Sequence, residues 1–485
     1  MIMERDQEVK KISIYINIVI LCLINNSYSS GEPSSYKSQE QKIERAKSQL
    51  PNNQYAKNII LFIGDGMSLG TITAARIYTG QESGEDGESY RLSFEDFPYT
   101  AISKTYNVNM QTPDSAGTAT AMVTGHKTNS GIINLSRDAK RGICNSVNSH
   151  KLKNIFELVY QEGLSVGVVT TTRITHATPA TVYAYSPDRN WETDGLLSKA
   201  GKDGGCSDIA SQLIDQSHRI QVALGGGLEM FMLEQYGGKR QSEDLINKWR
   251  SLYPYGKYVT NKKTLMSIEA SSDTKLLGLF ASNHLPYVLD RGDEIPSLPQ
   301  MTQKAIEILS TNPKGYILMV EAGRIDHAHH KGNANRALAE VRELDQTVAN
   351  TLSMVDIRDT LIIVTADHSH SFMMNGYAGR NSNILGLSRD ENGQINKDID
   401  GHVYTNISYS NGPGSKHNDD ELSDKMVFDK DYKQNALIPL ESVTHSSEDV
   451  VVSAIGPKSW LFQGFVEQNY IFHVMNEAFG FSKNE

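Results

Sequence analysis

Short apolar runs recur along the chain, and several of them stop at acidic or histidine-rich segments. Four runs show this most clearly, and they occupy residues 58–66, 165–170, 316–320 and 360–365. Each is short and apolar at consecutive positions, which is typical of strands buried on both faces of a parallel sheet. We therefore expect these four strands to share one sheet whose faces are covered by helices.

Segments between these runs carry apolar residues at helical spacing. Residues 153–162, 303–309 and 337–355 show the pattern. The longest segment has one apolar stripe, formed by Leu338, Val341, Leu344, Val348 and Leu352. Such stripes are core-facing helix surfaces. The alternation of strands and helices predicts an α/β fold with a doubly wound, mostly parallel central sheet flanked by helices.

Two regions depart from this alternation. Residues 36–56 are largely polar and contain a helical pattern at 39–50, so they form either an N-terminal arm or a helix that packs on a partner. Residues 377–440 are rich in Asn, Asp, Gly and Ser, which is typical of a surface insertion. The main domain is therefore expected over residues 57–485, with this insertion inside it.

The N-terminus has the pattern of an export signal. An apolar block at residues 12–24 follows Lys10 and Lys11 and is too short to span a bilayer. Together with the polar spacer that follows, residues 1–35 are expected to be a signal peptide, which predicts a secreted or periplasmic protein. The alternative is a buried N-terminal strand. The C-terminal tip is polar, so no lipid or membrane anchor is expected.

The three cysteines agree with export. Cys22 lies in the expected signal, which leaves Cys144 and Cys206 as an even pair that allows one disulfide. Two unrelated reduced thiols are the alternative.

Bulk composition is that of an ordinary soluble domain. The chain has 485 residues, of which 39% are hydrophobic and 21% are charged, enough for a large core. The formal charge is −10, from 47 basic and 57 acidic residues, and no basic tract suggests nucleic acid binding. An acidic protein that handles phosphate must concentrate positive charge locally, and bound metal can do that.

Candidate metal ligands follow the predicted strands. Asp326 and His330 are four residues apart, so they share one face if residues 324–330 are helical. The complete set of candidate zinc ligands is Asp65, Asp326, His330, Asp367, His368 and His445. Six such ligands suit two zinc ions with open positions for a substrate. Asp65, Thr178 and Glu321 offer only oxygens, which suits magnesium. Singly, each of these residues is more often structural, and the histidines near residue 330 could belong to a solvated turn.

A serine and an arginine complete the candidate chemistry. Ser115 lies in TPDSAGTATAM, where small residues permit close packing and a helix start. A serine at a helix N-terminus sits among backbone N–H groups that favour phosphate. Arg189, in SPDRNW, has a planar fork that matches two phosphate oxygens. The alternatives are an ordinary helix-capping serine and a surface arginine.

Taken together, these stretches resemble the alkaline phosphatase family from about residue 58 to residue 474. The matching stretches, in the family's order, are FIGDGM, TPDSAGTATAM, RITHATPA, SPDRNW, VEAGRIDHAHH, VTADHSH and THSSEDV. The histidines of VTADHSH and VEAGRIDHAHH are similar to those of the animal-type branch, and a secreted bacterial member would also fit.

The resemblance implies a role for each candidate residue. It implies metal-dependent hydrolysis of phosphate monoesters of broad specificity, with Ser115 forming a phosphoserine intermediate. It also implies two zinc ions and one magnesium ion. One zinc would be held by Asp326, His330 and His445, and the other by Asp65, Asp367 and His368. Magnesium would be held by Asp65, Thr178 and Glu321. Arg189 would grip the phosphoryl oxygens, with His176 and His327 supporting the site.

Further properties follow from the same resemblance. Cys144 and Cys206 sit where the animal-type branch has a disulfide, and residues 377–440 correspond to the crown region at the family's homodimer interface. Animal enzymes carry a calcium site with a Phe-Glu pair, and here Phe280 is followed by Ala281, which argues against that site.

Two other functions compete with this one. A sulfatase or phosphodiesterase of the same superfamily would use a different nucleophile motif, and Ser115 within DSAGTA argues against both. An inactive zinc-binding scaffold would lack a ligand or the nucleophile, and no candidate ligand is missing.

Overall fold

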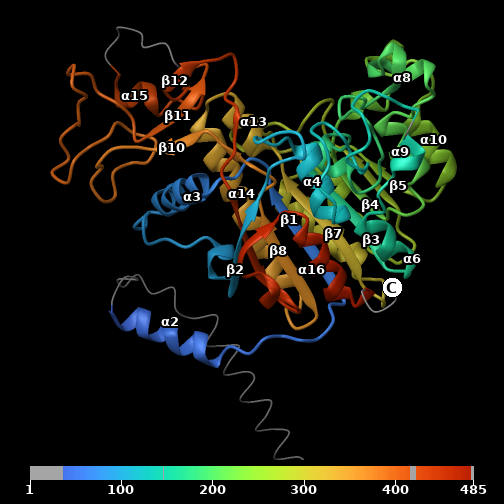
Figure 1. Ribbon diagram of the computed structural model, residues 1–485, viewed down its shortest axis with the longest axis horizontal. Coiled ribbons are helices and arrows are strands. Elements are labelled where there is room, and N and C mark those ends of the chain that lie inside the picture. The colour runs from blue at the N-terminus through green and yellow to red at the C-terminus, as the bar shows by residue number, and fades with distance from the viewer. Residues whose placement is uncertain (1–35, 146, 415–421, 482–485) are drawn as a thin grey trace, which may run out of the picture. The chain divides into compact units, whose positions relative to one another are not determined.

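A sheet of ten strands forms the centre of the molecule in a computed structural model, which describes residues 36–145, 147–414 and 422–481 (Figure 1). The strand order is β15-β2-β14-β8-β1-β7-β3-β4-β6-β5. The bounds in that order are Gly464–Glu467, Tyr99–Lys104, Val450–Ile455, Thr360–Thr365, Asn58–Gly64, Tyr316–Ala322, Ser165–Arg173, Val222–Gly226, Leu276–Leu279 and Lys257–Val259. Only β14 runs antiparallel to its neighbours β2 and β8. The predicted mostly parallel sheet is confirmed.

The four strands expected from sequence are adjacent in the middle of this sheet. They lie in the order β8-β1-β7-β3, and all pair in parallel. Because the carboxyl ends of parallel strands meet at one edge, the polar residues that follow these strands are brought together there.

Helices that follow residue 50 in the chain cover both faces of the sheet. The helices in chain order are α2 (Tyr36–Ser48), α3 (Leu69–Glu82), α4 (Ser115–Thr124), α5 (Val147–His150), α6 (Ile155–Gln161), α7 (Ala177–Ala180), α8 (Lys199–Asp203), α9 (Ile209–Asp215), α10 (Leu245–Leu252), α11 (Lys262–Met266), α12 (Leu298–Leu309), α13 (Arg324–His330), α14 (Ala334–Met354), α15 (Asp424–Val427) and α16 (Tyr470–Phe479). None of the helices described is long and apolar enough to cross a membrane.

Strand β1 shows how the two hydrophobic cores form. Its alternate residues Ile60 and Phe62 pack in one core with α3, α12 and α14. Ile59, Leu61 and Ile63 point to the other face and pack with α4, α6, α9 and α16. All five are fully buried, so this strand is apolar at consecutive positions because both of its faces are covered.

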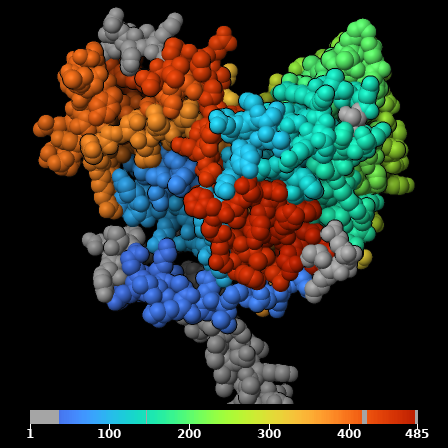
Figure 2. All heavy atoms as spheres, in the orientation of Figure 1, coloured from blue at the N-terminus to red at the C-terminus, as the bar shows by residue number. Residues whose placement is uncertain are grey.

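The expected insertion at residues 377–440 has structure of its own. Strands β11 (Ile407–Gly412) and β12 (Ala436–Pro439) form a three-stranded sheet with β10 (Phe372–Met374). Figure 1 groups these strands with α15, and Figure 2 shows the region as an orange lobe. The segment is therefore a packed small sheet as well as loops, because Tyr409 and Val427 within it are buried.

The N-terminal region is a separate unit that ends at Gln49, and Leu50–Glu485 form the second unit. Helix α2 falls within the segment expected to be an arm or helix. The expected signal peptide, residues 1–35, lies outside the described residues.

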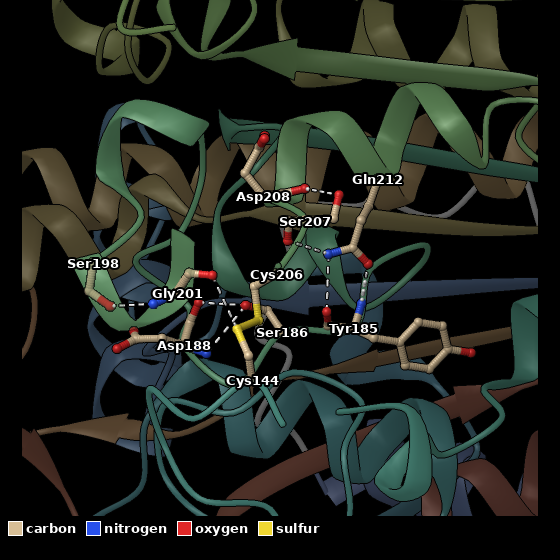
Figure 3. The surroundings of a disulfide bond; sticks show 10 residues. All are labelled: Cys144, Tyr185, Ser186, Asp188, Ser198, Gly201, Cys206, Ser207, Asp208 and Gln212. Atoms are coloured by element: carbon tan, nitrogen blue, oxygen red, sulfur yellow. Dashed lines mark hydrogen bonds between the residues drawn. A yellow bond between two sulfur atoms is a disulfide. The ribbon is translucent and has the colours of Figure 1, made fainter. Parts of the chain in front are cut away.

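A disulfide joins Cys144 to Cys206, whose Cα atoms are 5.7 Å apart (Figure 3). Next to it, Gln212 of α9 donates from Nε2 to the carbonyls of Tyr185 and Ser207 at 3.0 and 3.1 Å. The covalent bond attaches the segment around residue 144 to the segment just before α9, and the hydrogen bond to Tyr185 attaches that residue to α9 itself.

Candidate active site

Helix α13 presents Asp326 and His330 at the end of β7, as the spacing of these residues predicts. Asp326 Oδ1 lies 3.3 Å from His330 Nε2 and 3.4 Å from His445 Nε2, and the two Nε2 atoms are 3.2 Å apart. His330 Nδ1 faces the carbonyl of Val443 at 2.6 Å, and His445 Nδ1 faces that of Pro113 at 2.8 Å. A carbonyl only accepts, so each Nδ1 donates, and each neutral ring keeps its lone pair on Nε2. Two lone pairs and a carboxylate oxygen therefore converge on one point, which suits a cation.

A second group gathers beyond β1 and β8. His368 Nε2 lies 3.4 Å from Asp65 Oδ1, 3.3 Å from Asp367 Oδ2 and 3.2 Å from Ser115 Oγ. Its Nδ1 faces the Ser369 carbonyl at 3.3 Å, so Nε2 again carries the lone pair toward the cluster. The stacked rings of His368 and His445, with centroids 3.6 Å apart, place the two groups side by side.

Glu321 belongs to a third, oxygen-rich group. It accepts hydrogen bonds from the hydroxyls of Thr170 and Thr172, the latter at 3.0 Å. Burial is the main cause that raises the pKa of Glu321 to about 7. The nearby Thr178 side chain has the opposite effect and favours the ionised carboxylate. Asp65, His176 and Glu321 each place a ligand atom within 4.8 Å of the others.

Buried negative charge at these groups lacks compensation from the protein. Asp65, Glu321 and Asp367 are fully buried. Asp65 Oδ1 and Oδ2, Asp367 Oδ2 and Glu321 Oε1 have no hydrogen bond from any described residue. Burial and then the neighbouring carboxylates raise the pKa of Asp65 well above its usual value. Unpaired carboxylates are costly to bury, so these side chains fit bound cations.

His370 is a member of the site that the sequence analysis left without a role. Its Nε2 lies 2.6 Å from Asp326 Oδ1, and its Nδ1 lies 3.1 Å from the carbonyl of Thr444. His370 lies in β9 (Ser369–His370), which pairs with β13 (His445–Ser446) so that His370 is opposite His445. This short ladder fixes the segment carrying His445 to the segment carrying Asp367 and His368. The two-residue spacing of His368 and His370 was the only sequence signal.

Ser115 is the first residue of α4, as expected, but the helix N-terminus is less open than expected. The side chain of Asp114 accepts from the backbone N–H groups of Ala116 and Gly117 at 3.4 and 3.2 Å. The carbonyl of Asp114 accepts from Thr118. The expectation that several N–H groups are free for phosphate is therefore wrong, because the cap already uses them.

Asp114 also positions Arg189. Arg189 Nη1 donates to Asp114 Oδ2 at 3.0 Å, and Nη2 donates to His176 Nε2 at 3.1 Å. Burial alone would raise the pKa of Asp114, but Arg189 and a hydrogen bond from Gly131 hold it below its usual value. Arg189 is thus a charged group fixed beside Ser115. His327 lies next to His176, with ring centroids 5.4 Å apart.

All the predicted site residues except the two cysteines are thus brought to one edge of the sheet. A family model described as alkaline phosphatase matches residues 56–481. The chain belongs to the alkaline phosphatase family. Membership makes it a metal-dependent hydrolase of phosphate monoesters that works through a phosphoserine intermediate.

Relatives of known name agree over most of the chain. The tissue-nonspecific alkaline phosphatase of Gallus gallus is 42% identical over 468 residues, covering 92% of this chain and 89% of the relative. The alkaline phosphatase of Gadus morhua is 40% identical over 467 residues, covering 92% and 97%. The structure of Thermus thermophilus alkaline phosphatase matches with a TM-score of 0.64 and 23% identity, covering 93% of this chain and 95% of that chain. That last likeness concerns the fold.

Proposed function

We propose that Ser115 is the nucleophile that takes the phosphoryl group from monoesters of broad structure. The observation that carries this assignment is the position of Ser115 Oγ, which lies 3.2 Å from His368 Nε2 beside the buried carboxylates Asp65 and Asp367. A serine hydroxyl is a weak nucleophile until its proton is removed or its pKa is lowered. The cluster beside Ser115 is built to hold a cation that lowers this pKa.

Two zinc ions and one magnesium ion fit the three groups of ligands. The group of Asp326, His330 and His445 and the group of Asp65, Asp367 and His368 offer nitrogen and carboxylate donors, which zinc prefers. Asp65, Thr178 and Glu321 offer oxygen only, which magnesium prefers. Bound metals would supply Lewis-acid stabilisation of the charge that develops on the transferring phosphoryl group. The argument against a calcium site at Phe280 stays a prediction.

Arg189 is proposed to bind the phosphoryl oxygens. Its guanidinium is held by Asp114 and His176 beside Ser115, so its position is set before substrate arrives. His176 accepts from Arg189, and burial, followed by the charge of Arg189, lowers the pKa of His176 well below its usual value. His176 is therefore neutral and orients Arg189, and the ring of His327 packs edge-on against His176 and supports this arrangement.

Substrate selectivity tests the proposed function. The metal-loaded protein is expected to hydrolyse 4-nitrophenyl phosphate at least about 10³-fold more efficiently than bis(4-nitrophenyl) phosphate or 4-nitrophenyl sulfate, because cations arranged for a dianion lose much of their effect on a monoanion. The measurement is kcat/KM for the three esters, with the metal content determined on the same sample. Equal or greater activity on the diester or the sulfate would favour the rival hydrolases.

We further propose a homodimer formed through the lobe that carries β10, β11 and β12. This lobe exposes several large apolar side chains: Met373 and Met374 (39% each), Tyr377 (96%), Leu437 (81%) and Ile438 (53%). Apolar residues gathered on one region are typical of an interaction surface.

Disruption of this surface tests the dimer. The double variant Tyr377→Ser/Leu437→Asp is expected to halve the mass measured by light scattering, because it places a charge in a contact that excludes water. Phe465→Ser is the matched control, since Phe465 is 71% exposed but lies on β15 of the large sheet. A monomeric wild-type protein would refute the dimer and leave the catalytic proposal intact.

Export from the cytoplasm is the proposed localisation. The disulfide between Cys144 and Cys206 supports it, because such bonds persist mainly in oxidising compartments. The division into a signal peptide at residues 1–35, an arm at 36–56 and the phosphatase domain at 57–485 is part of the same proposal.

A further inference from the structure

A cavity of about 470 Å³ lies beside the cluster of Asp326, His330 and His445. Its wall includes His284, Tyr287, Arg324, His327, His330 and Lys331. The volume is within the range of pockets that hold small molecules. His330 belongs both to this wall and to the cluster, so the cavity starts at the cluster itself.

Two histidines of the ligand groups separate the nucleophile from the residue that faces the cavity. Ser115 contacts His368, His368 stacks on His445, and His445 contacts His330, which faces the cavity. In an in-line displacement the leaving group departs opposite the nucleophile. The leaving group of a substrate bound to Ser115 would therefore enter this cavity.

Arg324 brings into the wall a positive charge that forms no ion pair with any residue that the structure describes. Its guanidinium stacks on the ring of Tyr287, 3.7 Å from the centroid, and Nη1 donates to His327 Nδ1 at 3.1 Å. Its Nε is buried and has no hydrogen bond among the described residues. Glu340 is an acidic neighbour whose charge attracts Arg324. Its Oε1 accepts a hydrogen bond from the backbone N–H of Val288 at 2.7 Å.

Lys331 adds a second positive charge. It follows the last residue of α13, its side chain is exposed, and it forms no ion pair within the part of the chain that the structure describes. None of the described residues that line the cavity is acidic. The wall thus carries two positive charges in a chain whose net charge is −10.

We infer that this cavity is a subsite for leaving groups that carry a phosphate of their own, as in small bisphosphates. Arg324 would bind the second phosphate through its planar fork, and Lys331 would act as a point charge at the entrance. The inference rests on the proposed function and specifies which monoesters the site prefers.

Two substrates that differ only in the second phosphate test the inference. Propane-1,3-diol monophosphate and propane-1,3-diol bisphosphate release the same type of alkoxide. After correction for the two equivalent phosphates, kcat/KM for the bisphosphate is expected to be about thirtyfold higher at low salt, and 0.5 M NaCl should lower this preference about threefold because it screens the exposed charge of Lys331.

Variants of Arg324 and Lys331 test whether these two side chains cause the preference for the bisphosphate. Lys331→Gln should lower the ratio of the two kcat/KM values about threefold, as for an exposed charge pair, and Lys331→Arg should restore it. Arg324→Gln should lower the ratio about tenfold, as for a charge-assisted hydrogen bond that is mostly shielded from water. Lys257→Gln, on edge strand β5, is the control and should keep the wild-type ratio.

The outcomes separate this inference from the proposed function. A wild-type ratio of one, or a ratio that neither Lys331→Gln nor Arg324→Gln changes, would overturn the inference. If Arg324→Gln does not fold, Lys331→Glu decides, because reversing an exposed charge should lower the ratio more than Lys331→Gln does. Failure to hydrolyse either substrate would instead refute the proposed function.

Discussion

Replacing Ser115 by alanine is expected to lower kcat for 4-nitrophenyl phosphate by about 10⁴-fold or more, the scale seen when a nucleophile is removed from a concerted site. The hydroxyl lies 3.2 Å from His368 Nε2, and the alanine would leave the surrounding carboxylates and imidazoles in place. Metal content and thermal stability should therefore stay close to wild type. The loss would then be a loss of chemistry and not of structure.

Two measurements make this prediction specific. Acid-quenched wild-type protein mixed with phosphate-labelled substrate should carry label on Ser115, and the alanine variant should carry none. Thr118→Ala is the matched control on the same helix, because the Thr118 hydroxyl only donates to the carbonyls of Asp114 and Ser115. Retention of more than about one per cent of wild-type kcat by Ser115→Ala would exclude Ser115 as the nucleophile.

The central strands could be predicted because both of their faces are buried. The runs that became β1, β7, β8 and most of β3 are apolar at consecutive positions, which few other structures require. The outer strands gave no such signal. β2 reads YTAISK and is partly exposed, and β4 ends in two glycines, so their pairing depends on neighbours that are distant in sequence.

Helix boundaries were less predictable than helix positions. The expected helix at residues 303–309 begins instead at Leu298, because Ser297 caps it and Gln300 completes a capping box, with a proline in the first turn. The periodic pattern shows where a helix packs, whereas the cap decides where it starts.

Some contacts of the candidate site could be predicted from sequence, and others could not. The polar side chains that follow the parallel strands could be predicted to lie close together, since strand direction alone brings them to one edge of the sheet. The contact of His370 with Asp326 could not be predicted, because it joins the two-residue strand β9 to α13, and neither the pattern nor the strand direction places these two elements against each other. The bond between Asp114 and Arg189 likewise depends on a loop whose path the sequence pattern does not define, whereas the two cations of the cavity, Arg324 and Lys331, lie at the two ends of α13.

Removal of metal with a chelator is expected to lower kcat by about 10³-fold or more, since electrostatic stabilisation is usually the largest single contribution to catalysis. It should also destabilise the fold. Asp65, Glu321 and Asp367 are fully buried and Asp326 is 4% exposed, and without cations these four carboxylates share one small volume. A ligand at a thousand times its dissociation constant stabilises the folded state by about 4 kcal/mol, so loss of several ions should lower the melting temperature clearly.

Replacing single ligands distinguishes these groups from other acidic groups. Asp65 contributes to two of the ligand groups, so Asp65→Asn should lose both zinc and magnesium when metal content is measured by mass spectrometry. Asp398, Asp400 and His402 also lie within ligand distance of one another, but all three are exposed. Asp398→Asn is therefore the control and should keep the wild-type metal content and activity.

Zinc and magnesium added back together should restore kcat in the chelated wild type. The ligand residues lie at the edge of a sheet that is held by its own hydrophobic core, so the site should still be formed when the metals return. Full activity in a protein shown to be free of metal would contradict the proposed roles of all eight ligand residues.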